Sequence, residues 1–161
     1  MRETPNVDLS IRHVLATLAY RLGKVLRGTP PDFRDFRAAP GVRTPGQILA
    51  HIGDLMDWVL SIVEGRREWR NSEPLPWNEE IARFYGALEA LDQRIAEHGV
   101  GGVDAERLFQ GGLADALTHT GQIAMLRRLA GIPMRGESYY DAEIVVGRVG
   151  PDQAAPKREF D

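Results

Sequence analysis

Four stretches of this chain carry apolar residues at intervals of three and four, and breaks rich in glycine and proline separate the stretches. This spacing places the apolar side chains on one face of an α-helix, so each stretch predicts an amphipathic helix with one buried side. No segment makes a convincing core strand. We therefore expect an all-α fold, a four-helix bundle with an irregular C-terminal tail.

The four expected helices span about residues 8–27, 44–64, 77–98 and 113–130. The second has the clearest start. Thr44 occupies the N-cap, Pro45 the first helical position, and Gln47 the position whose side chain returns to the N-cap backbone. Gly65 and Gly131, which follow the second and fourth helices, are typical of helix ends. Start and stop signals therefore agree with the apolar spacing.

Two shorter segments lie outside these helices. Asp104 is suited to cap a short turn that ends at Gly111–Gly112, before the fourth long helix. Residues 134–161 show no helical period, and we favour an irregular strap over a short strand at Ile144–Val146. Because 161 residues is the size of one domain with one hydrophobic core, we assign residues 1–161 to a single domain.

Charge and composition exclude several classes of protein. The formal net charge is -3 at pH 7 and the basic residues are dispersed, which argues against a nucleic-acid partner. No apolar run approaches the roughly 20 residues that span a bilayer, and residues 1–5 form no apolar signal segment. The chain has no cysteine, so only His, Asp and Glu remain as ligands for a metal. We expect a cytoplasmic protein without a membrane partner.

The fourth helix is unusual, because Asp115 and His119 are its only ionisable side chains over residues 112–126. Its apolar residues point in several directions around the axis, which predicts a central helix covered on most sides. Asp115, His119 and Gln122 fall on one stripe, since steps of four and three residues return to the same face. An unpaired buried carboxylate is strongly unfavourable, so this stripe needs a partner.

A divalent metal ion would satisfy the stripe. Side chains one helical turn apart are about 6 Å apart at their bases, so Asp115 and His119 are close enough to share an ion. A third ligand must come from another helix, and His51, at the flank of the second helix's apolar stripe, is the best candidate. The alternative is a hydrogen-bonded pair of Asp115 and His119 without a metal, with His51 half exposed.

Two segments that contain His51 and His119 carry a resemblance. They read Thr44-Pro-Gly-Gln-Ile-Leu-Ala-His51 and Thr118-His119-Thr-Gly-Gln-Ile-Ala-Met-Leu-Arg-Arg-Leu-Ala-Gly131. This pattern resembles the DinB-like (DinB/YfiT) family of metal-dependent enzymes, over about residues 8–133. The resemblance implies a bundle that binds a divalent metal through His51, Asp115 and His119. The common family pattern has a histidine where this chain has Asp115.

The resemblance also implies a class of function. The ion would be zinc or nickel, with iron or manganese as alternatives that suit a carboxylate ligand. Some DinB-like proteins are thiol-dependent, which implies a metal-dependent thiol S-transferase or a hydrolase acting on a small-molecule substrate, with a low-molecular-weight thiol or water as the nucleophile. Such proteins often pair, which implies a homodimer. The alternative is a non-catalytic, metal-stabilised helical module for binding or dimerisation.

Other side chains are candidates for supporting roles, although none is assigned as a catalytic residue. Gln122 is suited to hydrogen-bond a ligand, Asp54 to orient the histidine three residues before it, and Glu137 to act as a base. His13 is expected to face solvent, and His98 lies at the end of its helix, where a cation complements the helix dipole. The aromatic residues that could wall a pocket are Trp58, Trp69, Trp77, Tyr139 and Tyr140.

Overall fold

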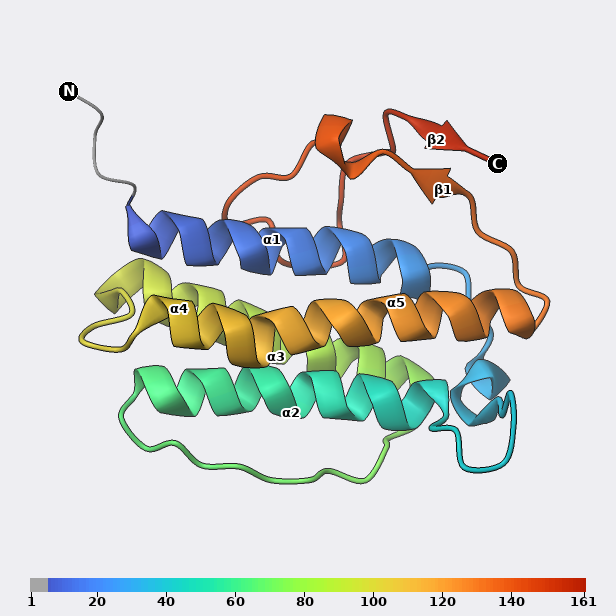
Figure 1. The fold of residues 1–161 in the computed structure, drawn as a ribbon, viewed down its shortest axis with the longest axis horizontal. Coiled ribbons are helices and arrows are strands. Elements are labelled where there is room, and N and C mark those ends of the chain that lie inside the picture. The colour runs from blue at the N-terminus through green and yellow to red at the C-terminus, as the bar shows by residue number, and fades with distance from the viewer. Residues whose placement is uncertain (1–5) are drawn as a thin grey trace.

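The computed structural model of the chain describes residues 6–161, and four long helical segments pack together in it, as the sequence predicts (Figure 1). Residues 1–5, in which the sequence shows no signal segment, lie outside the described part. The first three segments are α1 (Val7–Leu26), α2 (Pro45–Val63) and α3 (Trp77–His98). The fourth runs without a break through α4 (Ala105–Leu108), a π-helical turn (Phe109–Leu113) and α5 (Ala114–Leu129).

The predicted boundaries of α2 are confirmed. The Thr44 hydroxyl accepts a hydrogen bond from the Gln47 backbone N–H at 3.2 Å, and the Gln47 side-chain oxygen accepts one from the Thr44 N–H at 2.9 Å. These two bonds satisfy donors that a helix start leaves without partners. Gly65 follows the helix with a φ of 80°, in the left-handed region that favours glycine.

The helix directions follow from contacts between distant residues. Arg83 reaches the carbonyl of Ala50 near the start of α2, and Arg94 reaches that of Val63 at its end, so α2 and α3 run in the same direction. α1 and α5 are also parallel, because Arg127 caps carbonyls at the end of α1. Residues 64–76 must therefore return along the whole length of the bundle, as Figure 1 shows.

Each helix packs on two neighbours: α3 and α5 both contact α1 and α2. α1 and α2 therefore lie on one diagonal of the bundle, and a short 3-10 turn (Pro31–Asp35) lies between them in the chain.

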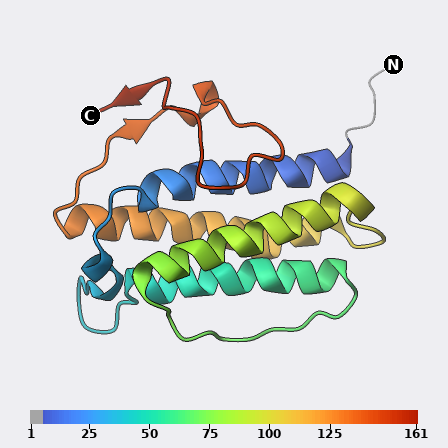
Figure 2. The ribbon, with the colours of Figure 1, turned by 180° about the vertical axis from the view of Figure 1, so that it is seen from behind.

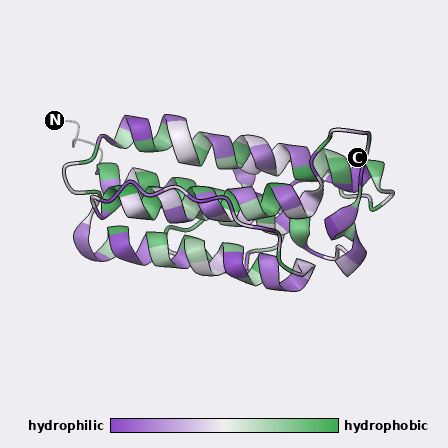
Figure 3. Cartoon of the chain, turned by 90° about the horizontal axis from the view of Figure 1, so that it is seen from below, coloured by the Kyte–Doolittle hydropathy of each residue, from purple (hydrophilic) through white to green (hydrophobic). Residues whose placement is uncertain are grey.

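The helices are banded in hydrophilic and hydrophobic residues (Figure 3), and no described helix is both long and apolar enough to cross a membrane. The largest fully buried side chains are Trp77, Phe84, Leu15, Leu18, Leu22, Leu49, Ile52, Met56, Leu88, Leu91, Ile95 and Leu113.

The burial predicted for the fourth helix is wrong. α5 lies at a corner of the bundle, and Met125 and Leu129 on its outer face are 65% and 60% exposed. α5 has few charges because its outer face carries small and uncharged residues such as Gly121 and Gln122, and these residues are exposed. The buried residues of α5 form a narrow stripe of Ala116, Thr120, Ile123, Leu126 and Arg127.

The prediction that the pair Gly111–Gly112 ends a short turn is wrong. Both glycines lie within the π-helical turn, and the helix continues through them. Asp104 caps α4 as expected, accepting from the backbone N–H groups of the next turn. A Cβ atom on Gly112 would overlap Cγ2 of Val59, whereas one on Gly111 would meet only an ordinary contact with Trp58 at 3.8 Å. Gly112 is therefore the point at which the fourth segment approaches α2 most closely.

The C-terminal tail is an irregular strap, as favoured, and no strand forms at Ile144–Val146. Two short strands lie elsewhere in it: β1 (Gly136–Glu137) pairs antiparallel with β2 (Glu159–Phe160). The strap lies beside α1 (Figure 2), where the buried Glu137 carboxylate accepts from the Tyr20 hydroxyl at 2.5 Å and from Lys24 at 3.0 Å. This buried network attaches the strap to the bundle.

We predict that Gly112→Ala lowers the free energy of unfolding by about 1–3 kcal/mol, because the added methyl group over-packs the contact with Val59. Gly111→Ala is the matched control and should be close to neutral, since its methyl group has room. Urea denaturation followed by circular dichroism measures both. Equal stability of the two variants would contradict a close approach at Gly112.

Candidate metal centre

The structure brings the three predicted ligands together. His51 comes from α2, and Asp115 and His119 lie one turn apart on α5. One ligand atom from each residue lies within 4.8 Å of the other two. The two Asp115 oxygens face the two imidazoles, at 3.5 Å from His51 Nε2 and 3.4 Å from His119 Nε2. Residues more than sixty positions apart therefore converge on one point.

The two carboxylate–imidazole distances are close to those between ligands of a small divalent ion. Two ligand atoms about 2.1 Å from a tetrahedral zinc ion are about 3.4 Å apart. The separations of 3.5 Å from Asp115 Oδ2 to His51 and 3.4 Å from Asp115 Oδ1 to His119 are close to this value. The triad as a whole spans up to 4.8 Å, so its side chains would draw together around a bound ion. The two imidazole rings are perpendicular, with centroids 4.8 Å apart. Two imidazoles and a carboxylate are also common zinc ligands.

The orientation of His119 is fixed by Gln122, in the supporting role that the sequence predicts. His119 Nδ1 lies 2.7 Å from Gln122 Oε1. An amide oxygen only accepts hydrogen bonds, so Nδ1 is the donor in this contact, and a neutral His119 ring then has its lone pair on Nε2. Such a partner fixes the tautomer and ring orientation of a metal-binding histidine. The free lone pair is on the nitrogen that faces Asp115.

The triad is partly open to solvent. The side chains of His51 and His119 are 21% and 13% exposed, and that of Asp115 is 46% exposed. Burial lowers the pKa of the His51 imidazole, and the neighbouring His119 acts in the same direction, while Asp115 opposes the shift. His51 is therefore neutral, the form that binds metals, at pH 7. The exposed side leaves room for water or a substrate.

A tryptophan from the long loop covers one side of His51. The Trp69 ring packs edge-on against His51 with centroids 5.6 Å apart, and Trp58 packs against Trp69 at 6.0 Å. Of the five aromatic residues proposed as pocket walls, these two lie at the site. Trp77 instead packs against Phe33, Tyr139 packs on α1, and Tyr140 is almost fully exposed.

The prediction that Asp54 orients His51 is wrong, because the Asp54 carboxylate binds other residues. Its buried carboxylate accepts from the Ser72 backbone N–H at 2.7 Å and the Ser72 hydroxyl at 2.6 Å, and forms an ion pair with Arg83. Arg83 also pairs with Glu80, which is fully buried and accepts from the Leu75 N–H. This network fixes the loop of residues 64–76 on the bundle and so holds Trp69 in place.

The other candidates lie outside the triad. Glu137 is not a base at this site, because its carboxylate is buried against Tyr20 and Lys24 of α1. His13 is exposed, as predicted, and His98 at the end of α3 is exposed as well. The predicted supporting group that the structure does bring to the triad is Gln122.

Arg43, which lies just before the cap of α2, was not predicted to be part of the site. Arg43 lines a pocket of about 220 Å³ beside His51 and another of about 520 Å³ beside His119. Its guanidinium makes no ion pair with another residue of the described range 6–161. The larger pocket has mainly apolar walls, from Val42, Ile48, Met125 and Leu126. A cationic side chain therefore flanks both histidines, next to an apolar recess.

Comparisons of the chain with protein-family models, with curated proteins and with solved structures found no match. The candidate centre therefore rests on the geometry of its own residues.

We predict that zinc affinity is constant near neutral pH and falls below about pH 6.5, because protons then compete with the metal for imidazole nitrogen. Because the pKa of His51 is lowered, protons compete with the metal for this imidazole only at more acidic pH than for an ordinary histidine. Titration of zinc against a competing chelator between pH 8 and pH 5 measures the effect. An affinity that does not change between pH 7.5 and pH 5 would show that no histidine binds the ion.

Proposed function

We propose that this protein binds one divalent transition-metal ion through His51, Asp115 and His119, and that it is a metal-dependent enzyme of the DinB-like type. The observation that carries the proposal is the convergence of three ligand atoms, one from each residue and from two helices, within 4.8 Å of one another. The resemblance of the segments around both histidines supports the same family. Zinc and nickel suit a set of two imidazoles, and the carboxylate also admits iron or manganese.

Three protein ligands leave at least one coordination position for an exogenous group. An ion bound there would supply a Lewis acid that lowers the pKa of water or of a low-molecular-weight thiol. Gln122 holds the His119 ring in the binding tautomer, and Trp69 covers His51 on one side. Because the chain has no cysteine, any thiol must arrive as a co-substrate.

The surroundings suggest what the substrate is like. The pocket of about 520 Å³ beside His119 is large enough for a small molecule, and its mainly apolar walls suit an apolar body. Arg43 stands at its edge with a guanidinium that would bind a carboxylate or stabilise negative charge that develops on the substrate. A thiol S-transfer or a hydrolysis, with an electrophile held between Arg43 and the triad, is the reaction class we propose.

A second candidate is a non-catalytic module that dimerises through α5. Met125 and Leu129, one turn apart on the outer face of α5, are the observation that favours it, since they are 65% and 60% exposed. Pairing of two such faces would bury apolar surface that is otherwise in contact with water. Both candidates are compatible with a homodimer, and light scattering on the purified protein determines whether one forms.

We predict that the purified protein binds one equivalent of zinc or cobalt and that His119→Ala abolishes stoichiometric binding while the helix content stays unchanged. His98→Ala, which replaces an exposed histidine at the end of α3, is the matched control and should bind like the wild type. Metal analysis after dialysis, with the visible spectrum of the cobalt form, measures binding. Full retention of metal by His119→Ala would refute the assignment.

Catalysis is tested by the conjugation of a low-molecular-weight thiol to an aryl chloride, with hydrolysis of an aryl ester in parallel. A chelator and His119→Ala should both abolish turnover, whereas Arg43→Gln should lower kcat/KM and keep the metal. If metal binds at full stoichiometry but neither reaction exceeds the rate without protein, the non-catalytic module is favoured.

A further inference from the structure

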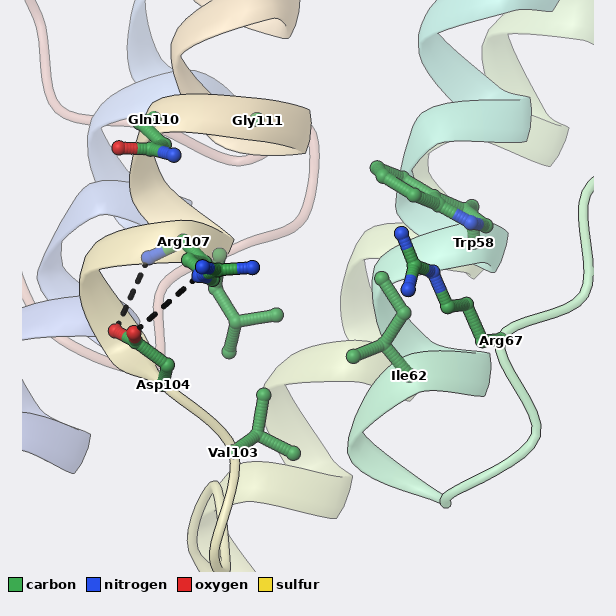
Figure 4. Close-up of a pocket in the computed structure, with 9 residues that line it drawn as sticks. Trp58, Ile62, Arg67, Val103, Asp104, Arg107, Gln110 and Gly111 are labelled. Carbon is green, nitrogen blue, oxygen red and sulfur yellow. Dashed lines mark hydrogen bonds and ion pairs between the residues drawn. The ribbon is translucent and has the colours of Figure 1, made fainter.

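A separate pocket of about 450 Å³ lies between the end of α2 and the start of the fourth helical segment (Figure 4). It shares no residue with the His51–Asp115–His119 triad. Its apolar lining residues are Trp58, Ile62, Val103 and Leu108, and its charged ones are Arg67, Arg107 and Asp104. The lining is about as polar as it is apolar, which suits a small molecule that carries both an apolar body and a charged group.

The charges around this pocket favour an anion. Figure 4 shows the guanidinium groups of Arg67 and Arg107 facing each other across the recess. Arg107 has a partial partner in Asp104 at 3.6 Å, whereas Arg67 forms no ion pair with another residue of the range 6–161. The neighbouring Arg66, by contrast, pairs with Glu64 at 2.7 Å. Arg67 is therefore a cation that lines the recess and has no carboxylate partner of its own among residues 6–161.

The backbone on both sides of the pocket is unusual. Arg67 has a φ of 53°, the left-handed region that residues with side chains rarely adopt, and it is the one such non-glycine residue in the described part of the chain. The Arg66 and Arg67 N–H groups both donate to the Ser61 carbonyl, at 2.8 Å and 3.2 Å, which holds this conformation. In a right-handed or extended conformation, the Arg67 side chain would leave the turn in another direction.

The opposite wall is the π-helical turn, which contributes Gln110 and Gly111. Such turns are rare and are found frequently at functional sites. The contact of Gly112 with Val59 accounts for the backbone of this turn, so the left-handed Arg67 is the unfavourable conformation that a ligand would explain. The recess, the unpaired guanidinium and the left-handed turn that directs it together point to a bound ligand.

We propose that this pocket binds a small carboxylate with an apolar, planar body, which packs against Trp58 while its carboxylate pairs with Arg67. A guanidinium is planar and binds a carboxylate through two parallel hydrogen bonds, so Arg67 selects for this group. The apolar residues Ile62 and Leu108 take up the rest of the molecule. The site is independent of the metal centre, because none of its residues binds the ion in our proposal.

The test uses 2-naphthoate as the probe, with chelator present so that the result does not depend on a metal. The full chain should bind it with a dissociation constant of about 1 mM or below. Binding should shift the indole N–H resonance of Trp58, which Trp58→Phe identifies among the three tryptophans. The neutral 2-naphthamide should bind about tenfold more weakly, because it forms no charged pair.

Arg67→Gln should weaken 2-naphthoate about tenfold and leave 2-naphthamide unchanged. Arg67→Gly is a second variant that keeps the left-handed turn without strain and should give the same loss, so a change in the backbone cannot explain it. Arg66→Gln is the matched control and should bind like the wild type. Equal binding of acid and amide, equal binding by Arg67→Gly and the wild type, or a shift that misses Trp58 would each overturn the proposal.

Discussion

The close contact between Gly112 and Val59 determines how α2 and the fourth helical segment are aligned. The backbone of the π-helical turn lies where a side chain would overlap Val59. The two helices are antiparallel, so residues that precede Val59 in α2 lie opposite residues that follow Gly112 in the fourth segment. His51 lies two turns, about 12 Å, before Val59 and therefore comes opposite Asp115 and His119. The triad is a consequence of this register rather than of any interaction among its own members.

A second constraint is the buried ion network between α2, α3 and the long loop. Arg83 pairs with Asp54 and Glu80, and both acids also accept backbone N–H groups of the loop, from Ser72 and Leu75. Loss of one partner would leave an uncompensated charge in the interior, which is strongly destabilising. The network therefore keeps the loop on the bundle, and with it the tryptophan that covers His51. Its acids are structural and are not available to the metal centre.

Features that depend on local spacing could be predicted from the sequence. The capping box at Thr44 needs only residues three apart, and the shared face of Asp115 and His119 follows from their separation by one turn. His51 could be placed beside them because it lies at the flank of an apolar stripe and because its segment resembles a known family. The four amphipathic helices were predictable for the same reason, since burial follows their 3.6-residue period.

Features that depend on contacts between distant residues could not be predicted. The scarcity of ionisable residues in α5 suggested burial, yet Met125 and Leu129 face solvent because the neighbours of α5 cover only one stripe of it. The pair Gly111–Gly112 reads as a helix end, and only the approach to α2 shows why glycine lies there. Arg43 and Arg67 lie in segments without periodicity, where no local pattern shows which side chains point into a pocket.

X-ray absorption spectroscopy of the zinc-loaded protein is the decisive measurement for the metal centre, because it reports the atoms bound to the ion. For the wild type we expect two imidazole nitrogens and one or more oxygens. In Asp115→His, a direct ligand at position 115 predicts a third imidazole in place of an oxygen. A wild-type spectrum with fewer than two imidazoles, or an Asp115→His spectrum identical to that of the wild type, would contradict the proposed centre.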